Sequence, residues 1–502
     1  MPSLNNMNRR RWFLLLVSLV LIVLSWWGIA AARNGLIVRS LEREGVPLLY
    51  MAPQEAQKAP AVLVAHGYAG SKQSMLGYAH VLAHSGYAVM LWDFVGHAAN
   101  PASFPASLPV SLEHGSLQRD LDIAAAALVE QPEVDPARLA LLGHLMGGGA
   151  VMRAGIANVN RFAATVAISP TSANVTPAAP RNLQLQAGSW EGRFVENTQW
   201  MLRAAGGENP NFAQARARSL QIIPNVAHIT ILFSNASHQA AKTWLNAAFN
   251  LPNTDNYTDR RMIWYALHLG AWLLLLSAIS PILADPTFAA RARVRPLKSW
   301  GGLLLAPVAA IGVLTLASRT NSPENLEGLL VVGGLLVGGA VALWFLVGGV
   351  VWLTFLGRLP RPTLRNALLG VALFALLWVA FGAMAQVVWL QWWLIPARLK
   401  LWPVLSLACF PWFLAAGLSQ QDAGVGNRIL WWLGQSVALV GGFFLTCYLV
   451  QLGFMFLLLP VFPVIIAILS LAAAQVNEAW SYGIGSALFF GWILAAGFPL
   501  AG

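Results

Sequence analysis

The residues best placed to do chemistry in this sequence lie in a turn at 143–149, which reads Gly-His-Leu-Met-Gly-Gly-Gly. Gly143 and Gly147 have the spacing of the G-x-S-x-G pattern, in which a serine on a tight strand-to-helix turn attacks a carbonyl carbon. Here the central position is Leu145, which has no lone pair to donate. The turn therefore indicates an acyl-transfer site that lacks its nucleophile.

A candidate acid follows this turn in the chain. Glu191 comes directly after the apolar run 183–188, in Gly-Ser-Trp-Glu. In a catalytic triad the carboxylate holds an imidazole in the productive tautomer. Glu196, about one turn further on, is the alternative acid. Glu191 also has a purely structural interpretation, since a helix N-terminus favours a negative charge.

Two histidines compete for the role of general base. His238 comes after the apolar run 228–234, which we predict to be the last strand, and it opens a predicted helix at 237–249. His228 stands at the start of that run instead, so His238 is the first choice. A structural role at the helix N-terminus is the alternative for His238.

The elements that must position these residues alternate between strand and helix over 33–250. Continuous apolar strands separated by helices imply a mostly parallel sheet that is covered on both faces. The run 36–53 predicts an antiparallel hairpin at one edge. The predicted strands are 61–66, 88–94, 138–144, 162–170, 183–188 and 228–234, and the predicted helices are 73–86, 116–131, 146–158, 192–205 and 237–249.

The rest of the chain is apolar. An uncharged run at 12–32 has the length that a membrane-spanning helix needs, roughly 20 residues. It is longer than the apolar core of a cleaved signal peptide, which favours a retained anchor. We expect a cytoplasmic N-terminus at 1–11, a linker at 251–261 and a multipass membrane domain at 262–502. Its eight predicted helices are 262–284, 300–317, 328–353, 366–390, 401–419, 429–450, 453–475 and 480–500.

Composition supports an integral membrane protein. Of the 502 residues, 57% are hydrophobic and 10% are charged, against about 25% charged in soluble proteins. The net charge of +11 does not indicate nucleic-acid binding, because 33–260 is nearly neutral and the excess lies beside apolar runs. Both cysteines, Cys409 and Cys447, lie in such runs. No metal-ligand spacing or nucleotide-binding fingerprint appears, so no metal or cofactor is predicted.

The positions of the basic residues predict the topology, because cytoplasmic loops are enriched in Lys and Arg. The arginines at 9–11 place the N-terminus in the cytoplasm and the 33–250 domain outside it, in a bacterial plasma membrane. Arg398 and Lys400 do not fit this scheme. The residues that fit it are Arg291, Arg293, Arg295, Lys298, Arg358, Arg361 and Arg365 inside, and Glu324 and Glu327 outside.

Taken in chain order, these motifs resemble the α/β-hydrolase superfamily over roughly 36–250. The segment 66–70 (HGYAG) matches the family's loop after its third strand, and 93–97 (DFVGH) matches its D-x-x-G-H turn. The resemblance implies an α/β-hydrolase fold of about eight strands. It also implies an oxyanion hole formed by the backbone N–H groups of Tyr68 and Met146. The loop residues His66, Gly67 and His144 complete the implied site, with Glu191 and His238 as acid and base.

Three functions follow as alternatives. The first is a membrane-anchored esterase or peptidase of the dienelactone-hydrolase or prolyl-oligopeptidase type, inactive or nearly so as written because Leu145 replaces the serine. The second is a non-catalytic pseudohydrolase that binds a ligand or partner. The third is a transporter with a hydrolase-like accessory domain, which the scarcity of ionisable residues in the apolar helices disfavours. The expected partners are the lipid bilayer and a small ester, acyl or peptide-like compound.

Overall fold

The computed structural model describes residues 8–105, 110–252, 256–283, 294–320, 331–332, 334–357, 359–450, 456 and 458–501. These residues form two compact units. The sheet unit comprises Trp26–Tyr265 together with Ala385–Trp393, and the helical unit comprises the residues up to Ser25, Ala266–Met384 and Leu394–Ala501. The domain boundaries predicted from the sequence stay predictions.

The sheet unit contains one eight-stranded sheet in the order β1-β2-β4-β3-β5-β6-β7-β8. The first two strands form the predicted antiparallel hairpin, and β2 joins β4 antiparallel. All other neighbours are parallel. The strands are β1 (Leu36–Arg43), β2 (Val46–Pro53), β3 (Ala59–Ala65), β4 (Ala88–Trp92), β5 (Val134–His144), β6 (Phe162–Ile168), β7 (Leu183–Gly188) and β8 (Arg218–Ile223).

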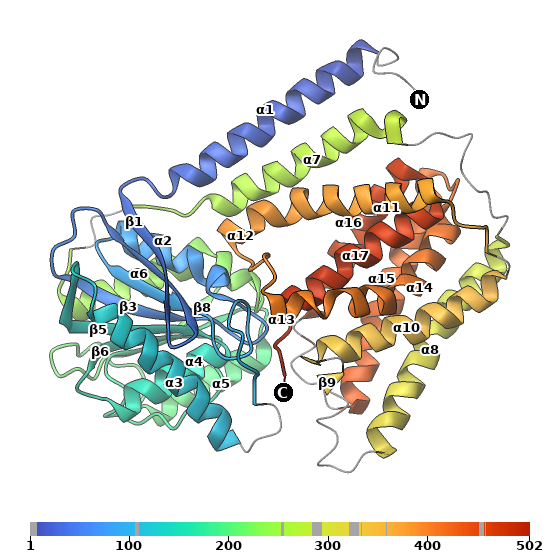
Figure 1. Cartoon of the computed structure of the whole chain (residues 1–502). Coiled ribbons are helices and arrows are strands. Elements are labelled where there is room, and N and C mark those ends of the chain that lie inside the picture. Colours follow the sequence, from blue (N-terminus) through green and yellow to red (C-terminus); the bar gives the residue numbers. More distant parts are fainter. Residues whose placement is uncertain are drawn as a thin grey trace. The chain divides into compact units, whose positions relative to one another are not determined.

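Helices cover both faces of this sheet (Figure 1). Helices α2 (Leu76–His84) and α6 (Asn235–Phe249) pack against each other on one face. Helices α3 (Val110–Val129), α4 (Met146–Ala157) and α5 (Gly192–Ala204) pack on the other. Because both faces are covered, β3 and β4 are buried along their whole length, as apolar central strands require.

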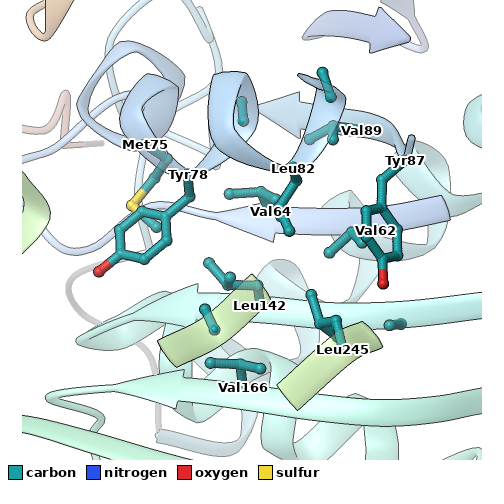
Figure 2. Packing of buried hydrophobic residues seen from close by; sticks show 14 of the residues in the cluster. Val62, Val64, Met75, Tyr78, Leu82, Tyr87, Val89, Leu142, Val166 and Leu245 are labelled. Atoms are coloured by element: carbon teal, nitrogen blue, oxygen red, sulfur yellow. The ribbon is translucent and has the colours of Figure 1, made fainter. Parts of the chain in front are cut away.

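The core beneath α2 and α6 is apolar. Figure 2 shows side chains of β3, among them Val62 and Val64, pointing into the same space as Leu82 of α2 and Leu245 of α6. All four are buried. Side chains so enclosed each contribute roughly 1.5–3 kcal/mol through burial. This packing fixes the strand ends from which the polar loops emerge.

The strand predicted at 228–234 is wrong. The structure has a turn there, followed by the short 3-10 helix η3 (Thr230–Phe233). The last strand of the eight-stranded sheet is β8. The apolar residues Ile231 and Leu232 are buried against the α2 and α6 core rather than in the sheet. The sequence of β8, RSLQII, escaped prediction because an edge strand is partly exposed and therefore less apolar.

The helical unit consists of apolar helices. Among the described residues, eight helices are long and apolar enough to cross a membrane, counting α1 (Arg9–Ala31), and α16 (Val461–Val476) is a shorter apolar helix. Helix α17 packs along α14 and α11, and α10 packs along α8 and α14. The other helices are α7 (Arg261–Leu283), α8 (Pro296–Thr320), α10 (Gly338–Leu356), α11 (Leu364–Leu377), η5 (a π-helix, Trp378–Ala383), α13 (Pro396–Leu399), α14 (Trp402–Gln420), α15 (Val425–Val450) and α17 (Ala479–Gly497). Helix α12 (Met384–Val388) follows η5 and belongs to the sheet unit from Ala385 on.

Two predicted apolar helices differ from the structure. Within the segment 328–353, the short strand pair β9 (Val331–Val332) and β10 (Leu335–Leu336) precedes α10, and residues 328–330 lie outside the described residues. Within the segment 453–475, helix α16 begins at Val461, after Pro460, and residues 453–455 and 457 lie outside the described residues. Of the residues behind the predicted topology, Arg291, Arg293, Glu324, Glu327 and Arg358 lie outside the described residues.

Candidate functional site

The turn between β5 and α4 has the backbone of a nucleophile elbow. Leu145 sits there with φ 51° and ψ −115°, a conformation that costs a non-glycine residue roughly 1–3 kcal/mol. Its N–H donates to the Ile168 carbonyl at 3.0 Å, and its own carbonyl accepts from the Gly149 and Thr171 amides. These bonds hold Leu145 in the position that a nucleophilic serine would take.

The glycines of the elbow are required by close packing. A Cβ on Gly147 would lie 2.4 Å from the His66 carbonyl oxygen, and one on Gly143 would lie 2.4 Å from the Gly147 carbonyl oxygen. A Cβ on Gly67 would come within 3.0 Å of the Leu145 Cβ. The loop that begins at His66 therefore passes directly over the elbow, as the predicted oxyanion arrangement needs.

We name residues 66–74 the HG loop. The His66 Nδ1–H donates to the Gly67 carbonyl at 2.7 Å, and its Nε2 accepts from the Phe94 amide at 3.0 Å. Burial lowers the pKa of His66, which suits this neutral tautomer. Both ring nitrogens are thereby used, so His66 shapes the loop.

The turn at 93–97 braces the HG loop. The Asp93 carboxylate accepts from the Lys72 amide at 2.8 Å and pairs with the Lys72 ammonium group. Its second oxygen also accepts from the Ala99 amide at 3.1 Å. His97 donates through Nδ1 to the Val95 carbonyl at 2.9 Å. The residues of this turn therefore stabilise the loop structure here.

The predicted acid, Glu191, is buried and anchored through both oxygens. Its Oε2 accepts from the Gly188 amide and from the Ser169 hydroxyl, each at 2.6 Å. Its Oε1 lies 2.6 Å from Nδ1 of His228. The alternative acid, Glu196, is exposed on α5. The carboxylate is thus aimed at an imidazole, as the acid of a triad must be.

The structure brings His228, and not His238, to Glu191. His228 lies in the turn after β8, against His144 with ring centroids 4.6 Å apart, and Phe194 stacks on it at 4.5 Å. His144 directly precedes Leu145. Within the described part of the chain, the buried Nε2 of His228 has no hydrogen-bond partner. That nitrogen is the atom through which a triad histidine would act on the nucleophile.

The predicted pairing of Glu191 with His238 is corrected accordingly. The Nε2–H of His238 donates to the Leu232 carbonyl at 2.8 Å, and its ring meets the Tyr78 ring edge-on at 4.4 Å. Burial lowers the pKa of His238. The physical reason for the error is the misplaced strand, because with β8 ending at Ile223 the loop after the last strand contains His228.

The two predicted oxyanion-hole residues flank the elbow. Met146 is the first residue of α4, where backbone N–H groups have no partner within the helix and the helix dipole favours negative charge. Tyr68 lies in the HG loop, with its ring against His97 and Phe104. Their role as donors stays a prediction. Across the described residues no group of three His, Cys, Asp or Glu side chains could hold a metal ion.

Sequence comparisons cover this unit only in part. Cutinase 1 of Thermobifida cellulosilytica is 30% identical over 101 residues, which are 20% of this chain and 36% of the cutinase. An uncharacterized protein of Mycobacterium tuberculosis is 35% identical over 121 residues, 24% of this chain and 40% of that protein. The chain therefore spans two fifths or less of the length of these curated relatives.

A solved dienelactone hydrolase from Anabaena variabilis is similar at 19% identity and a TM-score of 0.33, over 42% of this chain and 97% of that one. Residues 56–238 match the family model described as serine aminopeptidase, S33. Together with the mostly parallel eight-stranded sheet, this match identifies residues 56–238 as an α/β-hydrolase domain that is similar to the S33 family.

Proposed function

We propose that the sheet unit is a serine-hydrolase site for ester, acyl or peptide-like substrates in which Leu145 has removed the covalent step. The observation that carries this proposal is the Glu191–His228 pair, because the His228 ring lies against His144, the residue before Leu145, and its Nε2 has no partner among the described residues. As written, the chain hydrolyses such substrates slowly or not at all.

The chemistry follows from the positions of these groups. With serine at 145, His228 Nε2 would take the hydroxyl proton as the oxygen attacks the substrate carbonyl. Glu191 would stabilise the resulting imidazolium. The backbone N–H groups of Tyr68 and Met146 would donate hydrogen bonds to the negatively charged carbonyl oxygen. His228 would then return the proton to the leaving group, and water would hydrolyse the acyl-enzyme. Leucine offers no atom for the first step.

Restoring the serine tests this proposal. Full-length Leu145→Ser, purified in detergent, is expected to hydrolyse p-nitrophenyl butyrate and to be labelled by a fluorophosphonate probe, and the unchanged chain is expected to do neither. Leu145→Ala is the matched control, because it removes the leucine bulk without adding a hydroxyl. A folded Leu145→Ser protein without turnover or labelling would contradict the proposal.

A second candidate, a non-catalytic binding module, is supported by the backbone of Leu145. The elbow keeps its strained conformation although the residue there can no longer attack a substrate. Leucine at this position in close relatives would support a binding role, whereas serine in all of them would oppose it.

The location of the protein is part of the proposal. The eight long apolar helices are compatible with an integral membrane protein. We propose a cytoplasmic N-terminus and an extracytoplasmic hydrolase domain, as the arginines at 9–11 indicate. Reporter fusions before residue 12 and after residue 250 test this orientation, and a cytoplasmic signal from the second fusion would contradict it. The transporter alternative stays a prediction.

A further inference from the structure

A short segment from the C-terminal half of the chain belongs to the sheet unit. Ala385–Trp393 begins in α12 and ends before α13, between two stretches of the helical unit. The sheet unit therefore includes a segment that the hydrolase match at 56–238 does not contain. Its side chains show what this segment does there.

Gln391 joins the segment to the HG loop, 318 and 320 positions away in the chain. Its Oε1 accepts from Nε2 of Gln73 at 2.7 Å, and its backbone N–H donates to the Ser71 hydroxyl at 3.3 Å. All three residues are buried. Buried polar groups are costly when unpaired, so each of these bonds constrains both segments.

Gln391 is itself held in one orientation. Its Nε2 donates to the Trp393 carbonyl at 2.8 Å, and its Oε1 accepts a second bond from Nε2 of Gln386 at 3.2 Å. The side-chain Oε1 of Gln386 accepts from the Trp392 amide at 2.6 Å and from the Trp393 amide at 3.1 Å. The side chains of Gln386 and Gln391 thus hydrogen-bond within the segment 386–393 and restrict its conformation.

The bonds continue from Gln391 toward the elbow. Ser71 and Gln73 flank Lys72, whose amide and ammonium group both bond to Asp93. Within the loop, the Gly70 amide donates to the Gly67 carbonyl at 3.1 Å. Gly67 in turn lies against Leu145. These hydrogen bonds, together with the covalent chain of the HG loop, therefore connect Gln391 with Gly67, the residue next to Tyr68.

We propose that Gln391 is a positioning residue that holds the HG loop, and with it the Tyr68 amide, in the geometry needed to receive an oxyanion. The segment 385–393 then supports the loop that carries the proposed oxyanion donor. The catalytic consequence rests on the proposed function, whereas the structural one does not.

Hydrogen–deuterium exchange in the whole chain, with Leu145 retained, tests whether Gln391 holds the HG loop. Gln391→Leu removes the side-chain bond to Gln73 at similar volume and keeps the backbone N–H that donates to Ser71. We expect about tenfold faster exchange at the amides of Lys72 and Ser74, with amides of β5 unaffected. Gln435→Leu is the matched control, because Gln435 is equally buried and donates only within its own helix α15, to the Trp431 carbonyl. Unchanged exchange in the HG loop overturns the proposal.

Two milder variants keep the test decisive if Gln391→Leu does not fold. Ser71→Ala removes only the hydroxyl that accepts from the Gln391 amide, and it is expected to speed loop exchange by a smaller factor. Gln391→Glu keeps an oxygen facing Gln73, and it is expected to leave loop exchange near that of the unchanged chain. Equal exchange in Ser71→Ala and in the unchanged chain counts against the proposal.

Kinetics in the Leu145→Ser background test the catalytic part. Gln73→Leu and Gln391→Leu are each expected to lower kcat for p-nitrophenyl butyrate about tenfold with little change in KM, and the double variant to lose no more than either alone. Additive losses, or losses confined to KM, oppose the positioning role. If Leu145→Ser shows no turnover, the proposed function fails, and the exchange experiment still decides whether Gln391 holds the loop.

Discussion

Oε1 of Glu191 lies 2.6 Å from Nδ1 of His228, while Oε2 of the same carboxylate is held by the Ser169 hydroxyl and the Gly188 amide. A carboxylate fixed by two donors cannot rotate away from the ring that it orients. This arrangement directs Nε2 of His228 away from the acid, and that nitrogen lacks a partner among the described residues. The pair therefore retains the geometry of an acid and a base.

The first prediction separates the two histidines. In the Leu145→Ser background, His228→Gln is expected to lower kcat/KM for p-nitrophenyl butyrate by roughly 10³–10⁴-fold, because it removes the general base. His238→Gln is expected to retain most of the activity. It should lower stability by about 1–3 kcal/mol instead, because it disturbs a buried hydrogen bond to the Leu232 carbonyl. The reverse result would return the role of the base to His238.

The second prediction concerns the acid. Glu191→Gln in the Leu145→Ser background is expected to lower kcat by about 10⁴-fold, since the neutral amide no longer stabilises an imidazolium on His228. Glu196→Gln is the matched control, because Glu196 is exposed on the same helix and should leave kcat within about twofold of its parent. Steady-state kinetics at saturating ester measure both values. Equal losses in the two variants would show that the acid is misassigned.

The third prediction is a pH dependence of stability that comes from Asp120. Burial raises the pKa of this α3 carboxyl to about 6, although its oxygen accepts from the Val95 amide at 2.6 Å. Between about pH 4 and pH 6 the folded protein then binds more protons than the unfolded one, so stability falls as pH rises. Asp120→Asn should remove this loss of about 2–3 kcal/mol.

Denaturation of the detergent-purified chain from pH 4 to pH 7 measures this effect. Asp122→Asn serves as the control, because Asp122 lies on the same helix with an exposed side chain, 3.9 Å from Arg161. It should follow the unchanged chain at every pH. A parallel pH profile for Asp120→Asn and the unchanged chain would rule Asp120 out as the source.

The fourth prediction tests the packing of the elbow. Gly147→Ala would place a Cβ 2.4 Å from the His66 carbonyl oxygen, so the backbone must shift, at a cost of about 3 kcal/mol. Gly192→Ala, at the start of α5, has no atom within 4 Å of the added methyl group and should be neutral or slightly stabilising. Apparent melting temperatures of the two variants provide the comparison. Equal melting temperatures would mean that the HG loop does not pack on the elbow.

Several features of the fold and site could be predicted from local sequence. The elbow glycines, the hairpin at 36–53 and the strands of the sheet centre produce strong signals, because both faces of a central strand are buried and its residues must all be apolar. Glu191 was identified by its place just after such a strand. The apolar run at 12–32 likewise indicates its helix through length and composition alone.

The choice between two histidines could not be made in this way. The run 228–234 is apolar enough for a strand, but it forms η3 and buries Ile231 and Leu232 beneath α2 and α6. Partial exposure at the sheet edge gave β8 a weak signal, because its middle residues are half-buried or exposed. An apolar sequence indicates that a segment is buried, but it does not indicate which elements the segment packs against. Only the packing of the whole domain determines those partners.

The sequence by itself determined the kind of fold, the order of the site segments and the absence of a nucleophile at Leu145, since each depends on residue types at short spacing. The tertiary structure decided that His228 is the partner of Glu191 and that Gln391 reaches the HG loop. Those contacts join residues 37 and 318 positions apart, and such distances close only when the sheet and its helices have packed.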